Sequence, residues 1–254
     1  MKHINAFVLE RLKLNSDSKV RKHKYAPNTL NELDEIIRIK LKDMTNIFDP
    51  WSKKYDLDLT DVDVSNLDSL EGAIGSHAAI KSVNISGWNI SHIEDISGMF
   101  EECSYLQKII GLDTLDTSSV KLMTDLFEGC KNLEEIDLSK WNFNNVTDMA
   151  HMFSNCSGLK TIKGLENLNF TSLNRPAKLR SMFRRCTSLE KLDISKWKFN
   201  KLPICKNMFS LCEKLTDVGN IDHWKTYINN GTIERIRNMF DGAESLKKYP
   251  DWYK

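Results

Sequence analysis

The sequence predicts an α/β solenoid in which each repeat of about 26 residues supplies one strand and one short helix. The first observation behind this prediction is a recurring anchor, Met-Phe, followed by Cys after three residues and by Leu after six. Seven residues occupy the Phe position, at intervals of 26, 27, 26, 30, 26 and 31 residues, namely Ile74, Phe100, Phe127, Phe153, Phe183, Phe209 and Phe240. Such regular spacing is typical of a chain in which every repeat packs against its neighbours.

The residues just before each anchor give the second observation. In the repeat of Phe153 the apolar residues stand at i, i+3, i+6, i+7 and i+10, namely Val146, Met149, Met152, Phe153 and Cys156. Residues three and four apart lie on one face of an α-helix. The spacing therefore predicts a short helix in every repeat.

The residues after each anchor give the third observation. In the segments from Leu133 to Phe143 and from Leu189 to Phe199, apolar residues follow the Leu at +3 and +5 and enclose a polar one. This is the pattern of a three-residue strand whose flanking side chains point inward. Three other repeats run at +3, +6 and +9, so long and short repeats alternate. We therefore predict a leucine-rich-repeat solenoid of about seven repeats over residues 55–248.

The N-terminal end of such a solenoid needs a cap, because an open end would expose the core to water. Residues 1–54 are predicted to form a helical cap with a basic connector, and Pro50 marks the outer limit of its helix. Thr29 and Glu32 have the spacing of a capping box. The helix that they open carries apolar residues on one face, namely Leu30, Leu33, Ile37, Leu41 and Met44. A separate DNA-binding headpiece stays open as an alternative for residues 1–50.

The C-terminal end is predicted to be closed by residues 249–254. Pro250 interrupts the repeat there, and Trp252 is placed to cover the last layer of the core.

The net charge of +1 conceals an uneven distribution. Residues 51–174 carry 9 basic and 19 acidic side chains, for a net charge of −10, whereas residues 175–254 carry 17 and 9, for +8. With 41% hydrophobic and 28% charged residues, the composition excludes a disordered chain and a membrane-inserted one. The first residues lack the features of a signal peptide. We expect a cytoplasmic protein, or one on a cell surface or virion if a signal has been removed.

The sequence indicates no catalytic, cofactor or metal site, so we expect a protein that is not an enzyme. It contains none of the common nucleophile, phosphate-binding or zinc motifs, and its six His residues share no position in the repeat. Five of the six Cys residues occupy one inward position of the repeat, namely Cys103, Cys130, Cys156, Cys186 and Cys212. They are predicted to be free thiols packed in the core.

The strands predict one candidate binding surface. The residue between the two inward positions of each strand faces outward, which gives a row that includes Ile110 and Gly219 and the candidate partner-binding residues Asp58, Asn84, Asp137, Lys163 and Asp193. The alternative is that these polar residues only keep a long sheet soluble.

The charge gradient predicts a second candidate surface, a basic patch in the later repeats. We assign partner binding there to Lys178, Arg180, Arg184, Arg185 and Lys206. Clustered positive charge attracts acidic proteins, nucleic acids and nucleotide phosphates. An acidic protein or self-association is favoured, a solvated face without a partner is the second interpretation, and nucleic acid or nucleotide binding is the third, because outward aromatic residues for stacking are few.

The segment IDLSKWNFNNVTDMAHMFSNCSGLK, residues 136–160, resembles the repeats of the BspA-like family of bacterial surface proteins. The resemblance covers about residues 55–248 and implies a binding module without enzymatic activity in its repeats. The N-terminal segment is also similar to short repeat proteins without signal peptides from phages and mobile elements of gut bacteria.

These observations lead to a functional hypothesis, a non-enzymatic protein–protein interaction scaffold. The resemblance to phage proteins implies an inhibitor or sequestering protein that acts on a host factor. Two alternatives stay open, a surface or virion adhesion protein, and nucleotide or nucleic-acid sequestration by the basic repeats.

Overall fold

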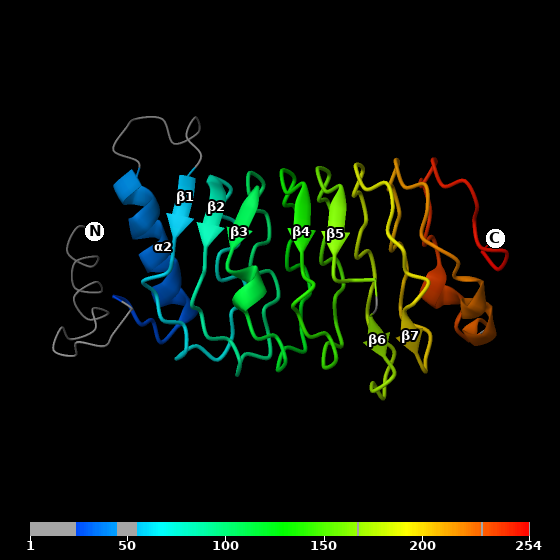
Figure 1. The fold of residues 1–254 in the computed structure, drawn as a ribbon, viewed down its shortest axis with the longest axis horizontal. Coiled ribbons are helices and arrows are strands. Elements are labelled where there is room, and N and C mark those ends of the chain that lie inside the picture. Colours follow the sequence, from blue (N-terminus) through cyan, green and yellow to red (C-terminus); the bar gives the residue numbers. More distant parts are fainter. Residues whose placement is uncertain (1–23, 45–54, 167, 230, 254) are drawn as a thin grey trace.

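The structure, a computed structural model, describes residues 24–44, 55–166, 168–229 and 231–253. The chain winds as a stack of coils, one for each repeat, from an N-terminal helix at one end to the C-terminal segment at the other (Figure 1). Each coil is named here by the residue at its Phe position. The six intervals between the seven anchors correspond to about six turns, which confirms the predicted solenoid.

Short parallel strands pair between neighbouring coils, at two separate positions of the coil (Figure 1). β1 (Tyr55–Asp58), β2 (Ile80–Asn84) and β3 (Lys108–Ile110) form one sheet in that order, β4 (Glu135–Asp137) pairs with β5 (Thr161–Lys163), and β6 (Asn169–Phe170) pairs with β7 (Lys198–Phe199). The alternation of inward and outward residues is as predicted, because Ile136 is buried in β4 between two exposed residues. The strand expected near Leu192 is reduced to a single bridge between Lys191 and Asp217.

The helix predicted in every repeat is wrong. Among the described residues the only α-helix is α2 (Leu30–Met44), and the remaining helical segments are three short 3-10 helices, η1 (Leu112–Thr114), η2 (Asp222–Tyr227) and η3 (Ile233–Ile236). The chain around each Phe is instead a run of tight turns. In coil Phe153, the amide of Met152 donates to the carbonyl of Met149, and the amide of Cys156 donates to that of Phe153.

Backbone amides that make no hydrogen bond within a turn donate to carbonyls of the next coil. The amide of Phe127 donates to the carbonyl of Met152 at 2.9 Å, and the amide of Gly129 donates to that of Ser154 at 2.9 Å. In a run of three-residue turns, every third side chain points inward. A short helix produces nearly the same spacing of inward side chains. The spacing alone could not separate the two structures.

The turns require a left-handed backbone at two positions of every coil, the second residue before the Phe position and the second after it. All fourteen of these residues have φ between 54° and 72°, and only four are glycines. A positive φ at the third residue of a turn is the mark of a type II turn. A side chain makes this conformation costly, so the contacts between coils must stabilise it.

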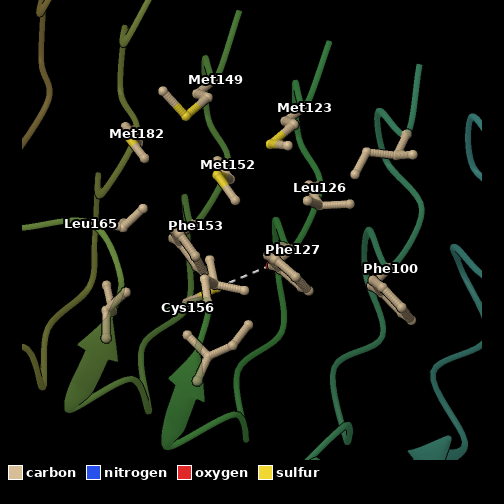
Figure 2. Packing of buried hydrophobic residues seen from close by; sticks show 14 of the residues in the cluster. Phe100, Met123, Leu126, Phe127, Met149, Met152, Phe153, Cys156, Leu165 and Met182 are labelled. Carbon is tan, nitrogen blue, oxygen red and sulfur yellow. Dashed lines mark hydrogen bonds between the residues drawn. The ribbon is translucent and has the colours of Figure 1, made fainter. Parts of the chain in front are cut away.

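The core contains a continuous stack of phenylalanine rings (Figure 2). The ring of Phe127 lies 5.4 Å from that of Phe100 and 5.3 Å from that of Phe153, with interplanar angles of 4° and 14°. The stack continues to Phe183, Phe209 and Phe240 with spacings of 5.8, 5.2 and 5.6 Å. These rings are buried. The distance between successive rings is close to the distance between neighbouring strands, so the rings and the strands repeat along the stack of coils at about the same interval.

The six Cys residues are free and buried, as predicted. The structure adds that five of them donate to a carbonyl of the preceding coil. The Sγ of Cys156, for example, lies 3.0 Å from the carbonyl oxygen of Phe127. Cys103, Cys130, Cys186 and Cys212 repeat the contact at 2.9 to 3.3 Å.

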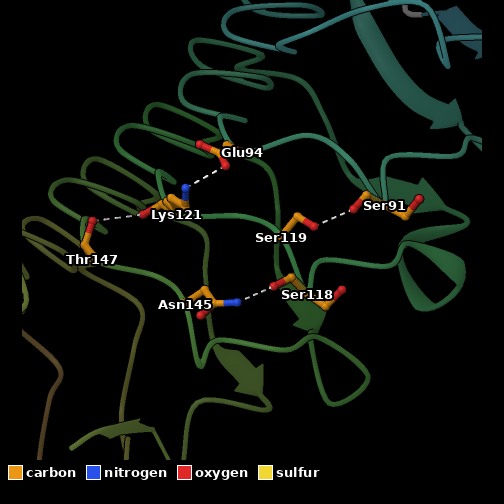
Figure 3. Close-up of polar contacts among 7 residues, drawn as sticks. All are labelled: Ser91, Glu94, Ser118, Ser119, Lys121, Asn145 and Thr147. Atoms are coloured by element: carbon orange, nitrogen blue, oxygen red, sulfur yellow. Dashed lines mark hydrogen bonds and ion pairs between the residues drawn. The ribbon is translucent and has the colours of Figure 1, made fainter. Parts of the chain in front are cut away.

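Exposed side chains join neighbouring coils as well (Figure 3). The Nζ of Lys121 lies 2.6 Å from the carboxylate of Glu94 in the preceding coil, and the amide of Asn145 donates to the carbonyl of Ser118 at 2.7 Å. Exposed ion pairs contribute little individually. The regular backbone bonds and the buried rings therefore carry most of the cohesion between coils.

Helix α2 covers the first coil. Thr29 accepts a bond from the amide of Glu32, whose carboxylate accepts one from the amide of Asn28, one residue before the expected partner. Leu33 and Ile37 are buried as predicted, and so is Ile36, which was not among the predicted residues. Leu30 and Leu41 are partly buried against the core. The predictions for residues 1–23 and for Pro50 lie outside the described residues.

The C-terminal segment covers the last coil. The indole of Trp252 stacks on Trp224 with ring centroids 6.3 Å apart, and its Nε1 donates to the carbonyl of Ile221 at 3.2 Å. The hydroxyl of Tyr253 accepts a bond from the amide of Phe240. Trp252 thus has the position that the sequence predicted for it.

Candidate functional site

The predicted sheet residues do lie in rows. Asp58 pairs with Asn84, which pairs in turn with Ile110, and Asp137 pairs with Lys163. The rows belong to separate sheets, because β3 and β4 are not paired. The polar surface predicted along the strands is therefore interrupted after Ile110.

The acidic and amide residues of these rows share a structural role. Each accepts a hydrogen bond on its Oδ1 from the backbone amide two residues later, in the pairs Asp58 with Thr60, Asn84 with Ser86, Asp137 with Ser139 and Asp193 with Ser195. Hydrogen bonds from the hydroxyls of Ser139 and Ser195 and from the backbone amide of Thr60, each joined by the second bond from the same residue, hold the pKa values of the three carboxyl groups below the ordinary value. Turn capping explains why Asp and Asn recur after the strands. A binding role for this row, including Lys163, stays a prediction.

The turns around the phenylalanine stack present a second surface, which we call the charged face. Its acidic half consists of Glu101, Asp125, Glu128 and Asp148, and its basic half of Lys178, Arg180, Arg184, Arg185 and Lys206. A ladder of parallel bridges runs beneath it from Asp95 through Leu122, Asp148 and Lys178 to Ile204. The ladder places successive coils in register, so the side chains form one continuous surface.

The acidic half holds carboxylates close together. Burial raises the pKa of Asp125 to about 7, and the neighbouring carboxyl group of Glu128 adds to the effect. Burial and the charge of Glu128 likewise raise the pKa of Glu101. This part of the surface thus crowds carboxyl groups together, and they hold their protons more tightly than exposed carboxyl groups do.

The sign of the charge changes between coils Phe153 and Phe183. The Nζ of Lys178 lies 2.7 Å from the Oδ2 of Asp148, one coil earlier. His151 lies on the acidic side of this boundary, and burial lowers its pKa, which favours the neutral imidazole at pH 7.

The basic half presents arginines that are free to bind. Arg180 and Arg185 are exposed and Arg184 is half-buried. In the described part of the chain, none of these three guanidinium groups has a carboxylate within 4.0 Å. The structure therefore brings together the residues predicted as a basic patch and leaves most of their charge uncompensated.

One group of residues on this face could hold a metal ion. The ligand atoms of Asp125, Glu128 and His151 all lie within 4.8 Å of one another, and the three residues are half-buried. This group was not predicted from the sequence, because the residues come from two coils. Aligning the second residue before each Phe position would have placed Asp125 beside His151.

The family of the chain follows from three overlapping matches. A family model described as "Mycoplasma protein of unknown function, DUF285" matches residues 24–111, 68–177 and 165–252. The chain belongs to the DUF285 family. The matches together span every coil of the described solenoid and helix α2, and each of them covers several coils.

Other comparisons are more distant. A solved structure of a leucine-rich cell surface protein from Faecalibacterium prausnitzii A2-165 is similar to 69% of this DUF285 chain, with 19% identity and a TM-score of 0.35. The chain spans 35% of the length of that protein. No curated protein matches the sequence. Within the described residues, no helix is long and apolar enough to cross a membrane.

Proposed function

We propose that this DUF285 chain is a non-enzymatic protein–protein interaction scaffold that binds through the charged face. The observation that carries the proposal is the division of one continuous surface into an acidic and a basic half. Opposite charges at fixed positions select a partner and its orientation, and they accelerate the encounter. The partner proposed for the basic half is a protein with an acidic surface.

The rigidity of the face supports this proposal. Backbone hydrogen bonds connect the turns of each coil to those of the next, and the ring stack lies directly beneath them. A surface that is ordered before binding loses little conformational entropy on association. The arginine side chains therefore need only their own ordering to form bidentate bonds with carboxylates.

Nucleic-acid binding is a weaker interpretation of the basic half. Single-stranded nucleic acids are bound through aromatic side chains on which bases stack. The large apolar residues exposed in the described chain are Tyr105, Ile110, Ile233 and Tyr249, and all four lie outside the segment from Lys178 to Lys206. A protein partner therefore fits the composition of this surface better.

We further propose that these repeats are related to the repeats of BspA-like surface proteins. The segment from Ile136 to Lys160 supports it through its Ser-x-Trp turn and its Met-x-x-Met-Phe sequence. An origin in a phage or mobile element, with a host factor as target, would make the scaffold an inhibitor.

A capture experiment with two matched variants tests the proposal. The immobilised chain is exposed to nuclease-treated bacterial lysate, and bound proteins are eluted with salt. Arg184→Glu with Arg185→Glu should abolish the capture of the partner, whereas Lys247→Glu with Lys248→Glu, which changes the net charge equally, should not. Equal capture by both variants would contradict a role for the charged face.

A further inference from the structure

We propose that the charged face also binds a second copy of the chain, in an antiparallel dimer whose two-fold axis passes through coil Phe153. This inference rests on the proposed function, because it names one partner of the same surface. It follows from three features of the face, which are the order of its charges, its spacing and the residues at its centre.

The charges are ordered so that a two-fold rotation brings opposite signs together. Rotation about coil Phe153 superimposes coil Phe127 on coil Phe183 and coil Phe100 on coil Phe209. Asp125 and Glu128 then face Arg180, Arg184 and Arg185 of the second copy. A parallel, in-register pair would instead place each acidic half against the other, where like charges repel.

The next coils outward follow the same rule. Glu101 and Glu102 belong to coil Phe100, and Lys206 belongs to coil Phe209, which becomes its counterpart. Each end of the face would therefore contribute at least one opposite pair.

The spacing of the coils allows this superposition. The ring centroids are separated by 5.4 and 5.3 Å from Phe100 to Phe153, and by 5.8 and 5.2 Å from Phe153 to Phe209. The two halves of the face thus have nearly the same pitch. An interface that uses the same patch twice needs this match.

The residues near the axis suit a contact with their own copies. A charged residue on a two-fold axis would face the same charge. Ala150 and Asn155 of coil Phe153 carry no charge, and the carboxylate of Asp148 in the same coil is paired with Lys178 of its own copy. The centre of the face is therefore the one part that two copies can share without repulsion.

The ends of the solenoid argue for this lateral contact and against a head-to-tail one. Helix α2 buries Leu33 and Ile37 against the first coil, and Trp252 stacks on Trp224 at the last. Among the described residues, the core layer at each end is covered in this way. Self-association is thus assigned to the side of the stack.

Sedimentation equilibrium of the purified chain is the first test. We expect a dimer at low salt and a monomer at about 1 M salt, where charges are screened beyond about 3 Å. Arg184→Glu with Arg185→Glu should be monomeric, and so should Glu101→Lys with Glu128→Lys. A mixture of the two variants should dimerise again. A wild-type chain that stays monomeric at low salt overturns the inference.

Disulfide formation between engineered cysteines tests the geometry. Ala150→Cys lies near the axis and should link two copies on mild oxidation. Ser97→Cys occupies the equivalent position in coil Phe100, far from its own copy, and should not link alone but should link with a Lys206→Cys chain. Efficient linkage of Ser97→Cys to itself overturns the antiparallel arrangement.

The outcomes separate this inference from the function on which it rests. A monomeric wild-type chain whose capture of a lysate protein still depends on Arg184 and Arg185 contradicts only the dimer. A salt-dependent dimer that is unaffected by both charge reversals contradicts the use of the charged face in self-association, and the capture experiment then decides its role toward other proteins.

Discussion

The thiol of Cys156 donates to the backbone carbonyl of Phe127 in the preceding coil, with the sulfur 3.0 Å from the oxygen (Figure 2). The contact recurs in five coils and explains why this position holds Cys. The space around this side chain is small, and without the thiol the carbonyl of Phe127 would lack a hydrogen-bond donor on that side. In the last coil Ala243 fills the same position without a thiol.

The native chain should resist alkylation of its thiols. Burial raises the pKa of Cys103 and Cys212 to about 12 and that of the other four thiols at least as far. Since only the thiolate reacts, the folded chain should show almost no labelling near pH 8. Iodoacetamide labelling followed by mass spectrometry checks this, with the urea-unfolded chain as the control in which all six thiols are labelled. Labelling of the folded chain at the rate of a free cysteine would show that the Cys positions are open.

Breaking the ring stack should destabilise the solenoid strongly. Phe127→Ala removes a buried ring that stacks on both sides, and we expect a loss of about 3–5 kcal/mol in the free energy of unfolding. Phe127→Leu keeps more volume and should lose less. Urea denaturation measures both. Equal losses would mean that filling the cavity and stacking contribute nothing at this position.

Two glycines with the same backbone conformation should differ in their tolerance of Ala. Gly87 has φ 88°, and no atom lies within 4 Å of the place that a Cβ would take, so Gly87→Ala should cost about 1–2 kcal/mol. Gly164 has φ 93°, and a Cβ there would lie 2.4 Å from the carbonyl carbon of Leu138 in the preceding coil. Gly164→Ala should cost about 1–3 kcal/mol more. Similar unfolding midpoints for the two variants would contradict the close packing of the coils.

The crowding of carboxylates on the charged face predicts a pH dependence. The folded chain binds the proton of Asp125 more tightly than the unfolded chain, because its pKa is raised to about 7 from 3.8. Its contribution to stability is therefore greatest at low pH and falls as the pH rises from about 4 to about 7. Asp125→Asn should be more stable than the wild type at about pH 8, and the difference should vanish near pH 4.

Urea midpoints at several pH values check this prediction. The control is Asp116→Asn, because hydrogen bonds from Ser118 lower the pKa of Asp116. That variant should gain no stability at about pH 8. A wild-type chain as stable as Asp125→Asn at every pH would remove the argument for a crowded acidic half.

The repeats, the strands and the core could be predicted from the sequence, because inward positions recur at a fixed phase. The turns could not, since Val146, Met149 and Met152 have a spacing that fits both a helix and successive turns. Gly98 and Gly129 indicated the two left-handed positions, but Asp125 and His151 occupy the position of Gly98 with side chains. Their conformation depends on bonds to the neighbouring coil, which are long-range contacts.

The candidate sites were predictable in part. Outward residues such as Asp137 were placed correctly, but their turn-capping role, which follows from the short Asp-Leu-Ser spacing, was not recognised from the sequence. Arg184 and Arg185 of the basic patch are adjacent in sequence and Arg180 lies four residues earlier, so the patch could be predicted directly. The acidic half was missed as a site because Glu101, Asp125 and Glu128 come from two coils and gather only when those coils stack.

The reactivity of lysines in a complex tests most directly whether the molecule binds through the charged face. The chain is acetylated with and without its captured partner, and each lysine is quantified by mass spectrometry. We predict that the partner protects Lys178 and Lys206 and leaves Lys163 and Lys191 on the sheet side unchanged. Protection of Lys163 and Lys191, with Lys178 and Lys206 still reactive, would show that the strands bind the partner and would contradict this account.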